Sequence, residues 1–515
     1  MKNNNEKRGG AERLFDAVTE IDHDLVDGSR PKDAKRRSHA VRKGIIAAVV
    51  AAAMALGVVG GIALHERRGK NAGGADEKTP APVADDRERF NPFVVSAEYP
   101  VYETAKECML AAREAEKNVS EETKKALISI AKERLTNAEN KNAVIAPVSI
   151  YMALGVLSEV SAGETQQQIL DLLNADNTDV VGEQVGAIWD TCYSMGDWYK
   201  DALAEIDKEF GKETPYDADD GVHSLIGASL WLDNRYEYNM DLLESVAEKY
   251  KASSFIGQFG TEEYNEVFRE WLAEQTQGVY PGDGNVGFDP KTTFAVATSI
   301  YFKSSWSPSF DAEKNTDGIF HGATKDDNCV YMNEDTDLGI YRGDGFLIAE
   351  MLLSDPGSRF AHVWFALPDE GQSVDAVASS DELWEFITSC EGQVPASDRQ
   401  KISLSMPKFS VENKSDFIPY LRELGVTDVF DAEKADFSPL GKMFSSASVG
   451  LFDHNVHVSV NENGLEGAGY STSALMKGID PSDPIDEFIL DRPFAFFVTT
   501  YEGLPLFAGV VNQIN

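Results

Sequence analysis

The chain has 515 residues, a formal net charge of −39 and an apolar fraction of 42%. This length and apolar content suffice for a large folded core. The charge is uneven, because residues 1–70 hold 14 Lys and Arg against 9 Asp and Glu, so the remainder is strongly acidic. Such an acidic surface repels nucleic acid and favours solubility or basic partners.

An uncharged apolar stretch near the N-terminus predicts a membrane anchor. Ile45–Leu64 contains twenty residues without a charge, about the length that a helix needs to span a bilayer. The alternatives are a buried alanine-rich helix or the apolar core of a secretory signal, which usually lies nearer the start. More Lys and Arg precede the stretch than follow it, which predicts a cytoplasmic N-terminus. We therefore expect a cytoplasmic segment at 1–43 and a transmembrane anchor at 44–65.

The region 66–118 is predicted to be a flexible stalk followed by a short extension. Residues 69–91 are rich in Gly, Ala and Pro and lack the apolar content to build a core. A helix is expected around Thr104–Lys117, and no function is assigned to it.

A globular domain is predicted from residue 119 to residue 515. Its first helix opens after Ser120, a suitable N-cap. A buried strand then runs through Asn142–Ala146, is broken at Pro147, and leads into a helix at Tyr151–Glu159. Further apolar segments predict strands at Leu225–Leu232 and Thr293–Phe302, and a helix at Tyr264–Thr276.

The segment from Val460 to Asp480 is unlike the rest of the chain. From Gly467 to Met476 it contains no charge and no proline, so every amide in that stretch can join a sheet ladder. Because strand neighbours point to opposite faces, Leu465, Gly467, Gly469, Ser471, Ser473 and Leu475 would share one face, which is uncharged and mostly small. The composition alone also fits a flexible linker.

The flanks of this segment resemble the serpin family. Val460-Asn461-Glu462-Asn463-Gly464 is similar to that family's strand end and hinge, and Glu487–Phe494 is similar to its C-terminal signature. Earlier segments also resemble serpins, among them Asn142–Ile150, Ile300–Trp306 and Leu424–Phe430. The resemblance covers about residues 119–515.

The resemblance implies an α+β serpin fold with a large central mixed sheet, two further sheets, surrounding helices and an exposed reactive-centre loop. In serpins the cleaved loop inserts into the molecule's own sheet. The hinge would comprise Glu462, Gly464, Leu465, Glu466, Gly467, Ala468 and Gly469. The region that parts for the loop would include Ser149, Trp306 and His454. Ala146 and Thr298 stand where the family commonly has serine and asparagine.

The resemblance further implies a suicide-substrate inhibitor of serine proteases, in which the protease supplies the chemistry. Counting by the family's usual loop length places the cleaved bond at Gly478–Ile479. The bond Lys477–Gly478 would suit a trypsin-like pocket and is favoured narrowly, while Met476 would suit chymotrypsin- or elastase-like pockets. A membrane-anchored serpin with a basic cytoplasmic flank resembles a bacterial surface protein.

Two other classes of function stay open. A non-inhibitory serpin that acts as a surface binding module would be signalled by a proline or an inward charge in the hinge, and neither is present. An enzyme is disfavoured, because His454 and His457 lack the Glu and the spacing of a metalloprotease helix and no nucleophile elbow is found. The four cysteines have no metal-site spacing, and we expect no metal and no cofactor.

Overall fold

The computed structural model describes most of the chain beyond residue 92. The described residues are 93–99, 105–193, 223–276, 287–306, 309–351, 353, 361–389, 399–444, 447–450, 452–466, 486–500 and 502–514. They all belong to one compact unit, Asn91–Asn515. The predicted anchor at 44–65 lies outside them, and among the described helices none is long and apolar enough to cross a membrane.

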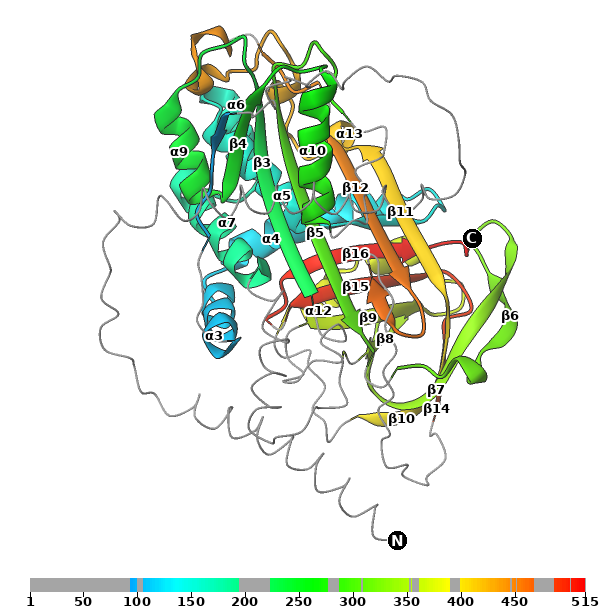
Figure 1. The fold of residues 1–515 in the computed structure, drawn as a ribbon. Helices are drawn as coiled ribbons and strands as arrows, with labels where there is room; N and C mark the ends of the chain where they lie inside the picture. The colour runs from blue at the N-terminus through cyan, green and yellow to red at the C-terminus, as the bar shows by residue number, and fades with distance from the viewer. Residues whose placement is uncertain are drawn as a thin grey trace, which may run out of the picture. The chain divides into compact units, whose positions relative to one another are not determined.

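One layer of the described structure is a seven-stranded mixed sheet (Figure 1). The strands β3 and β4 are parallel, and the other neighbours are antiparallel. In spatial order the strands are β1 (Phe93–Val95), β4 (Ala252–Gly257), β3 (His223–Asp233), β5 (Phe294–Ser305), β13 (Gly464–Glu466), β12 (Asp453–Val460) and β11 (Phe409–Asp416).

A second group of strands is joined by one long strand, β7 (Asp326–Gly343). One part of β7 pairs with β6 (Thr316–His321) and β10 (Gln400–Pro407), and the other part pairs with β8 (Phe346–Met351). The two further sheets of the prediction are therefore continuous through β7. The remaining strands of this group are β9 (Ala361–Pro368), β15 (Phe494–Thr500), β16 (Pro505–Val511), β2 (Ala143–Ile145) and, beside β10, β14 (Asp486–Ile489).

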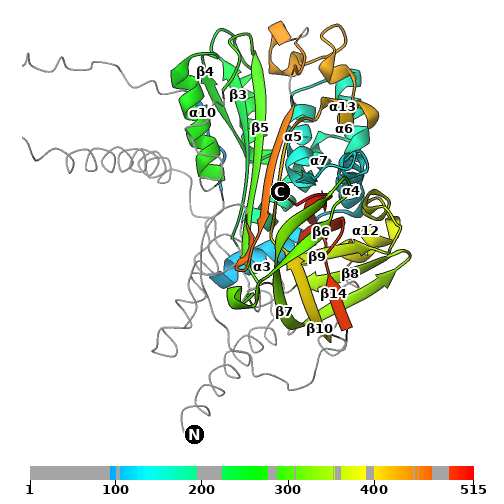
Figure 2. The same cartoon turned by 90° about the vertical axis from the view of Figure 1, so that its right-hand side faces the viewer.

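Most helices lie behind the seven-stranded sheet, and α10 (Glu262–Gln275) crosses its front (Figures 1 and 2). The side chain of Thr261 caps α10 by accepting a hydrogen bond from the Tyr264 amide. An aromatic cluster around Trp231 of β3 holds this helix on the sheet. The other helices are α3 (Ala105–Glu116), α4 (Glu121–Thr136), α5 (Pro147–Glu159), α6 (Gly163–Leu172), α7 (Thr178–Tyr193), α9 (Met240–Lys249), α11 (Val374–Ala378), α12 (Asp381–Thr388) and α13 (Ile418–Glu423).

The centre of the core is α5, whose residues are buried from Pro147 to Ser158. A helix that is apolar on all sides is expected to be enclosed by other elements, and α5 packs against both β5 and β16. The helix begins at Pro147, earlier than predicted, because proline is compatible with the first helical turn. The α+β architecture expected from the sequence, with a large mixed sheet, further strands and surrounding helices, is confirmed.

Candidate functional site

The candidate site is the junction where β13 lies between β5 and β12 (Figure 1). Gly464 pairs with Ser305 of β5, while Leu465 pairs with both Ser304 of β5 and Val460 of β12. Within the described residues, no ladder joins β5 directly to β12. In the described part of the chain, β5 and β12 are therefore bridged only by the short β13.

The turn that leads into β13 is held by Trp306, at the end of β5. The indole Nε1 donates to the Asn461 carbonyl at 2.8 Å, and the Trp306 amide donates to the Asn463 carbonyl at 2.9 Å. The side chain of Trp306 is buried beside Phe365. Trp306, which the resemblance places where the loop would begin its insertion, thus contacts residues 461–463 directly.

Glu462 anchors the same turn from the other side. Its carboxylate accepts a hydrogen bond from Asn315 at 2.6 Å and forms an ion pair with Lys408. Partial burial alone would raise the pKa of this carboxyl, but the hydrogen bonds from Lys408 and Asn315 outweigh burial and hold the pKa below its usual range. The first hinge residue is therefore a fixed anion.

We expect Lys408→Met to loosen this turn and lower the free energy of unfolding by about 1 kcal/mol, since the pair is only partly exposed and carries a charge-assisted hydrogen bond. Urea unfolding of the chain from Phe90 onward measures the change. The matched control is Lys125→Met, whose partner Glu122 lies 3.9 Å away in an exposed pair and which should cost about 0.3 kcal/mol. Equal losses in both variants would contradict an anchoring role for Lys408.

Gly464 and Leu465, two of the predicted hinge residues, lie within β13. Leu465 is buried, with 1% of its surface exposed, and therefore faces the interior. At Gly464 a Cβ would collide with the Ser304 carbonyl, so only glycine allows the strand to approach β5 this closely. The other predicted hinge residues, Gly467, Ala468 and Gly469, lie outside the described residues, as do Met476, Lys477, Gly478 and Ile479.

Beneath the junction, β5 and β12 are each hydrogen-bonded to the start of α5. The Thr298 hydroxyl donates to the Ser149 carbonyl at 3.0 Å. On the other strand, Nε2 of His454 accepts from the Ala146 amide at 3.1 Å. The Ser149 carbonyl thus lies beneath β5, while His454, a residue of β12 itself, directs its imidazole to the start of α5. Thr298 and Ala146 take part in these contacts despite their departure from the family pattern.

His454 is buried and neutral. Burial, with a smaller contribution from the Arg134 guanidinium, lowers the pKa of its imidazole to about 3. Because Nε2 accepts a hydrogen bond, the ring carries its proton on Nδ1. The structure assigns His454 a hydrogen-bonding role, and among the described residues no group of three or more His, Cys, Asp or Glu is arranged to hold a metal.

Sequence reasoning missed three side chains of this region, namely Arg134, Asn315 and Lys408. Arg134 is buried, donates to Asn413 of β11 at 2.8 Å and lies over the Tyr420 ring. Its position four residues after Ile130, on the apolar face of α4, was the available signal. Asn315 and Lys408 have no such periodicity, because only the folded chain brings them to Glu462.

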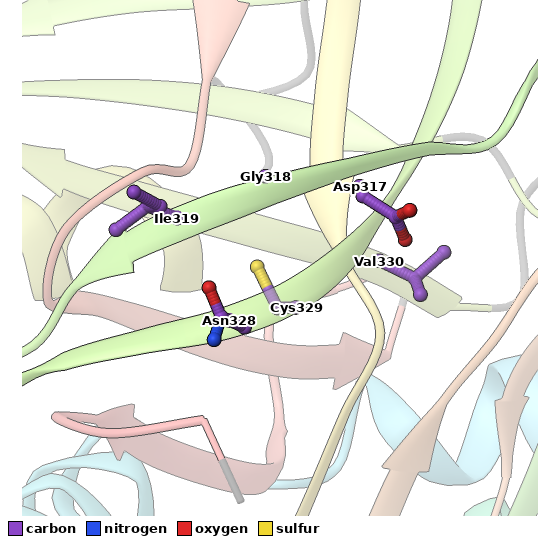
Figure 3. Close-up of a pocket in the computed structure, with 6 residues that line it drawn as sticks. All are labelled: Asp317, Gly318, Ile319, Asn328, Cys329 and Val330. Atoms are coloured by element: carbon purple, nitrogen blue, oxygen red, sulfur yellow. The ribbon is translucent and has the colours of Figure 1, made fainter.

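A separate hollow of about 530 Å³ lies on the hairpin of β6 and β7 (Figure 3). It contains Ile319, which is half exposed, and the thiol of Cys329. Burial raises the pKa of this thiol, which disfavours a reactive thiolate. Cys329 and Cys192 are both free cysteines.

Comparison with known proteins places this arrangement in a family. The model of the family described as serpin (serine protease inhibitor) matches residues 122–514. Serpin-Z2A of Oryza sativa subsp. japonica is 27% identical over 418 residues, which cover 73% of this chain and 92% of the relative. Serpin B6 of Pongo abelii is 24% identical and covers 70% and 89%.

Solved structures share the fold. The thermophilic serpin tengpin in the native state has a TM-score of 0.61 at 22% identity, covering 82% of this chain and 98% of its own. Human kallistatin has a TM-score of 0.62 at 19% identity, covering 78% and 99%. Thyroxine-binding globulin in complex with thyroxine has a TM-score of 0.58 at 21% identity, covering 76% and 99%.

Proposed function

The chain belongs to the serpin family, whose members are generally protease inhibitors, and we propose that it is a suicide-substrate inhibitor of serine proteases. The observation that carries this proposal is β13, which already pairs with both β5 and β12 at the start of the loop. The segment that would be cleaved continues directly from this strand. Insertion would extend a ladder that has already begun.

The register of β13 predicts where each inserted residue would lie. Leu465 is opposite Ser304, and Glu466 is opposite Lys303. Continued down β5, the same register ends with Leu475 opposite Phe294, the first residue of that strand. The inward face would consist of Leu465, Gly467, Gly469, Ser471, Ser473 and Leu475. None of these is charged or bulky beyond leucine, which favours burial against the helices below.

This register supports a cleaved bond beyond Leu475. Cleavage of the Lys477–Gly478 bond would keep every residue that can pair with β5 on the inserting strand. The bonds after Met476 and at Gly478–Ile479 satisfy the same condition, so the length of β5 does not separate them. Lys477 is retained as the favoured residue before the cleaved bond, since a lysine directs a trypsin-like pocket to one position.

The reaction itself uses the protease's groups. Its serine hydroxyl attacks the carbonyl carbon of the residue before the cleaved bond, the peptide C–N bond breaks, and the new amine leaves with a proton from the protease's histidine. The acyl ester keeps the protease covalently attached to the loop while the loop inserts. Trapping requires that insertion outpaces hydrolysis of this ester.

We also propose that residues 44–65 anchor the protein in a cell membrane, with residues 1–43 cytoplasmic and the serpin domain extracellular. The support is the uncharged stretch and the excess of basic residues before it. A surface protein of bacterial type is the setting that this arrangement favours, and proteases outside the cell would be its partners.

A surface binding module is the second candidate. One solved structure with this fold is a thyroxine-binding globulin in complex with thyroxine, so the fold also accommodates ligand binding. The inhibitor is favoured because the predicted inward face of the loop carries no charge and no proline.

The test is to incubate the ectodomain from Phe90 with trypsin-, chymotrypsin-, elastase- and subtilisin-like proteases and to analyse the products on denaturing gels. We expect a complex that survives denaturation with at least one protease, and mass spectrometry of the released peptide to give Gly478 as its new N-terminus. Cleavage without a complex by every protease, and without a gain in thermal stability of the cut product, would favour the binding module.

A further inference from the structure

Residues 93–116 lie outside the region that the family model matches, yet they are part of the folded unit. β1 adds a strand to the free edge of β4, with Val94 opposite Phe255. The Ala97 amide donates to the Ser253 hydroxyl at 3.1 Å. Tyr99 then stacks on Trp189 of α7, with ring centroids 4.8 Å apart. This segment thus connects the edge of the main sheet to the helices behind it.

The C-terminal end of the segment is fastened by Glu116, the last residue of α3. Its carboxylate is 4% exposed and accepts a hydrogen bond from the Glu502 amide, in the turn between β15 and β16, at 3.0 Å. Lys124 of α4 donates to the Glu502 carbonyl at 2.9 Å. α3 also packs along α7. A buried carboxyl is therefore the polar contact at which α3 meets the C-terminal strands.

Burial at Glu116 outweighs the neighbouring groups that would favour a negative charge there. The side chain of Thr500, on β15, forms a hydrogen bond with Glu116, and the carboxylate of Glu502 repels a charge there. Cys192 of α7 is also close, because a charge on Glu116 contributes to raising the pKa of its thiol. Lys124 is the nearby cation, but its ammonium is shared with Glu121 at 3.2 Å and with the Glu502 carbonyl. Burial raises the pKa of Glu116 to about 7.

We propose that the described parts of this segment, residues 93–99 and 105–116, form a clasp that is held on the serpin domain while Glu116 carries a proton and that opens more readily once Glu116 ionises. Opening would withdraw α3 from α7 and, with it, β1 from β4. The main sheet would then have a free edge at β4, whose unpaired amides and carbonyls can pair with another strand. This proposal stands on the contacts of the clasp and is independent of protease inhibition.

The test is hydrogen–deuterium exchange of the full-length chain, followed in the peptides of α3 and β1 at pH 5.5, 7 and 8. The variant Glu116→Gln keeps a neutral oxygen that accepts from the Glu502 amide, and comparison at the same pH cancels the intrinsic change in exchange rate. We expect exchange of α3 in the native chain to rise about 30-fold more than in Glu116→Gln between pH 5.5 and pH 8.

The matched control is Glu114→Gln, on the same helix, where Glu114 is exposed and pairs loosely with Lys117 at 3.8 Å. It should follow the native chain at every pH. The proposal is overturned if α3 of the native chain and of Glu116→Gln exchange in parallel from pH 5.5 to pH 8. It is also overturned if Glu114→Gln suppresses the rise as strongly as Glu116→Gln does.

Discussion

Replacing Ser471 with arginine is expected to abolish the denaturant-resistant protease complex and to leave the loop cleavable. Continued from β13, the register places Ser471 opposite Thr298 of β5 and His454 of β12. It would share the inward face with Leu465, which is buried. A guanidinium at that position would be enclosed without a carboxylate, at a cost of several kcal/mol.

The matched control is Tyr470→Arg, one residue earlier. Strand neighbours alternate faces, so this arginine would lie on the outward face and remain hydrated. We expect Tyr470→Arg to form the complex with a stoichiometry within about twofold of the native chain, because an exposed substitution changes stability by about 0.5 kcal/mol or less. The measurement is a titration of active protease against each variant, with the cut fraction read from the gel.

The two variants also separate failures of the mechanism from failures of the register. If both variants form the complex, the loop is not buried at these positions and insertion is not the inhibitory step. If Tyr470→Arg fails and Ser471→Arg succeeds, insertion occurs with the opposite face inward. In either case a rise in thermal stability after cleavage of the native chain still reports whether the loop inserts.

Much of the fold could be predicted because the informative segments are local. Asn142–Ile150 combines a buried strand with a proline that ends it, and the residues before Gly464 resemble the serpin hinge. The sequence also predicts the inward position of Leu465, because neighbouring residues of a strand point to opposite faces. These features depend on neighbours in the sequence.

The sequence did not predict the tertiary contacts of the site. Glu114 and Glu116 occupy the same helical stretch and are the same residue type, yet only Glu116 is buried. What distinguishes them is the turn at Glu502, which the sequence places at the other end of the domain. The pairing of Lys408 with Glu462 has the same origin, because two strands must fold together before the charges meet.

We expect the stability of the serpin domain to depend on pH through two buried groups with opposite slopes. The pKa of His454 falls from its ordinary 6.5 to about 3 in the folded protein. The unfolded chain therefore binds the proton more readily, and the contribution of His454 is fully present above pH 6.5 and lost as pH falls toward 3. Between these limits the slope is about 1.4 kcal/mol per pH unit.

Glu116 acts in the other direction. Its pKa rises from an ordinary 4.5 to about 7, so the folded protein binds the proton more readily than the unfolded chain. Its contribution is fully present below pH 4.5 and is lost as pH rises through 7, again with a slope of about 1.4 kcal/mol per pH unit. Between pH 4.5 and 6.5 the two slopes cancel, so stability from these groups is flat there.

Both slopes are tested by urea unfolding of the chain from Phe90 onward, in its native form and as Glu116→Gln and His454→Gln, from pH 3.5 to 8.5. The glutamine at 454 keeps an acceptor for the Ala146 amide, which the buried imidazole now supplies. Glu116→Gln should gain stability over the native chain by about 3 kcal/mol at pH 8 and little at pH 4.5. In the difference between two variants the contributions of the surface carboxylates cancel, because these groups are present in all of them.

His454→Gln should lose less stability than the native chain below pH 6, by about 2–3 kcal/mol at pH 4.5. If this variant fails to fold, the imidazole signals of the native protein give the pKa of His454 directly by titration. A pKa near 6.5 would mean that protonation is not resisted at this site. The bond to the Ala146 amide would then break in mild acid, and the contact between β12 and α5 would be the first part of the sheet to loosen.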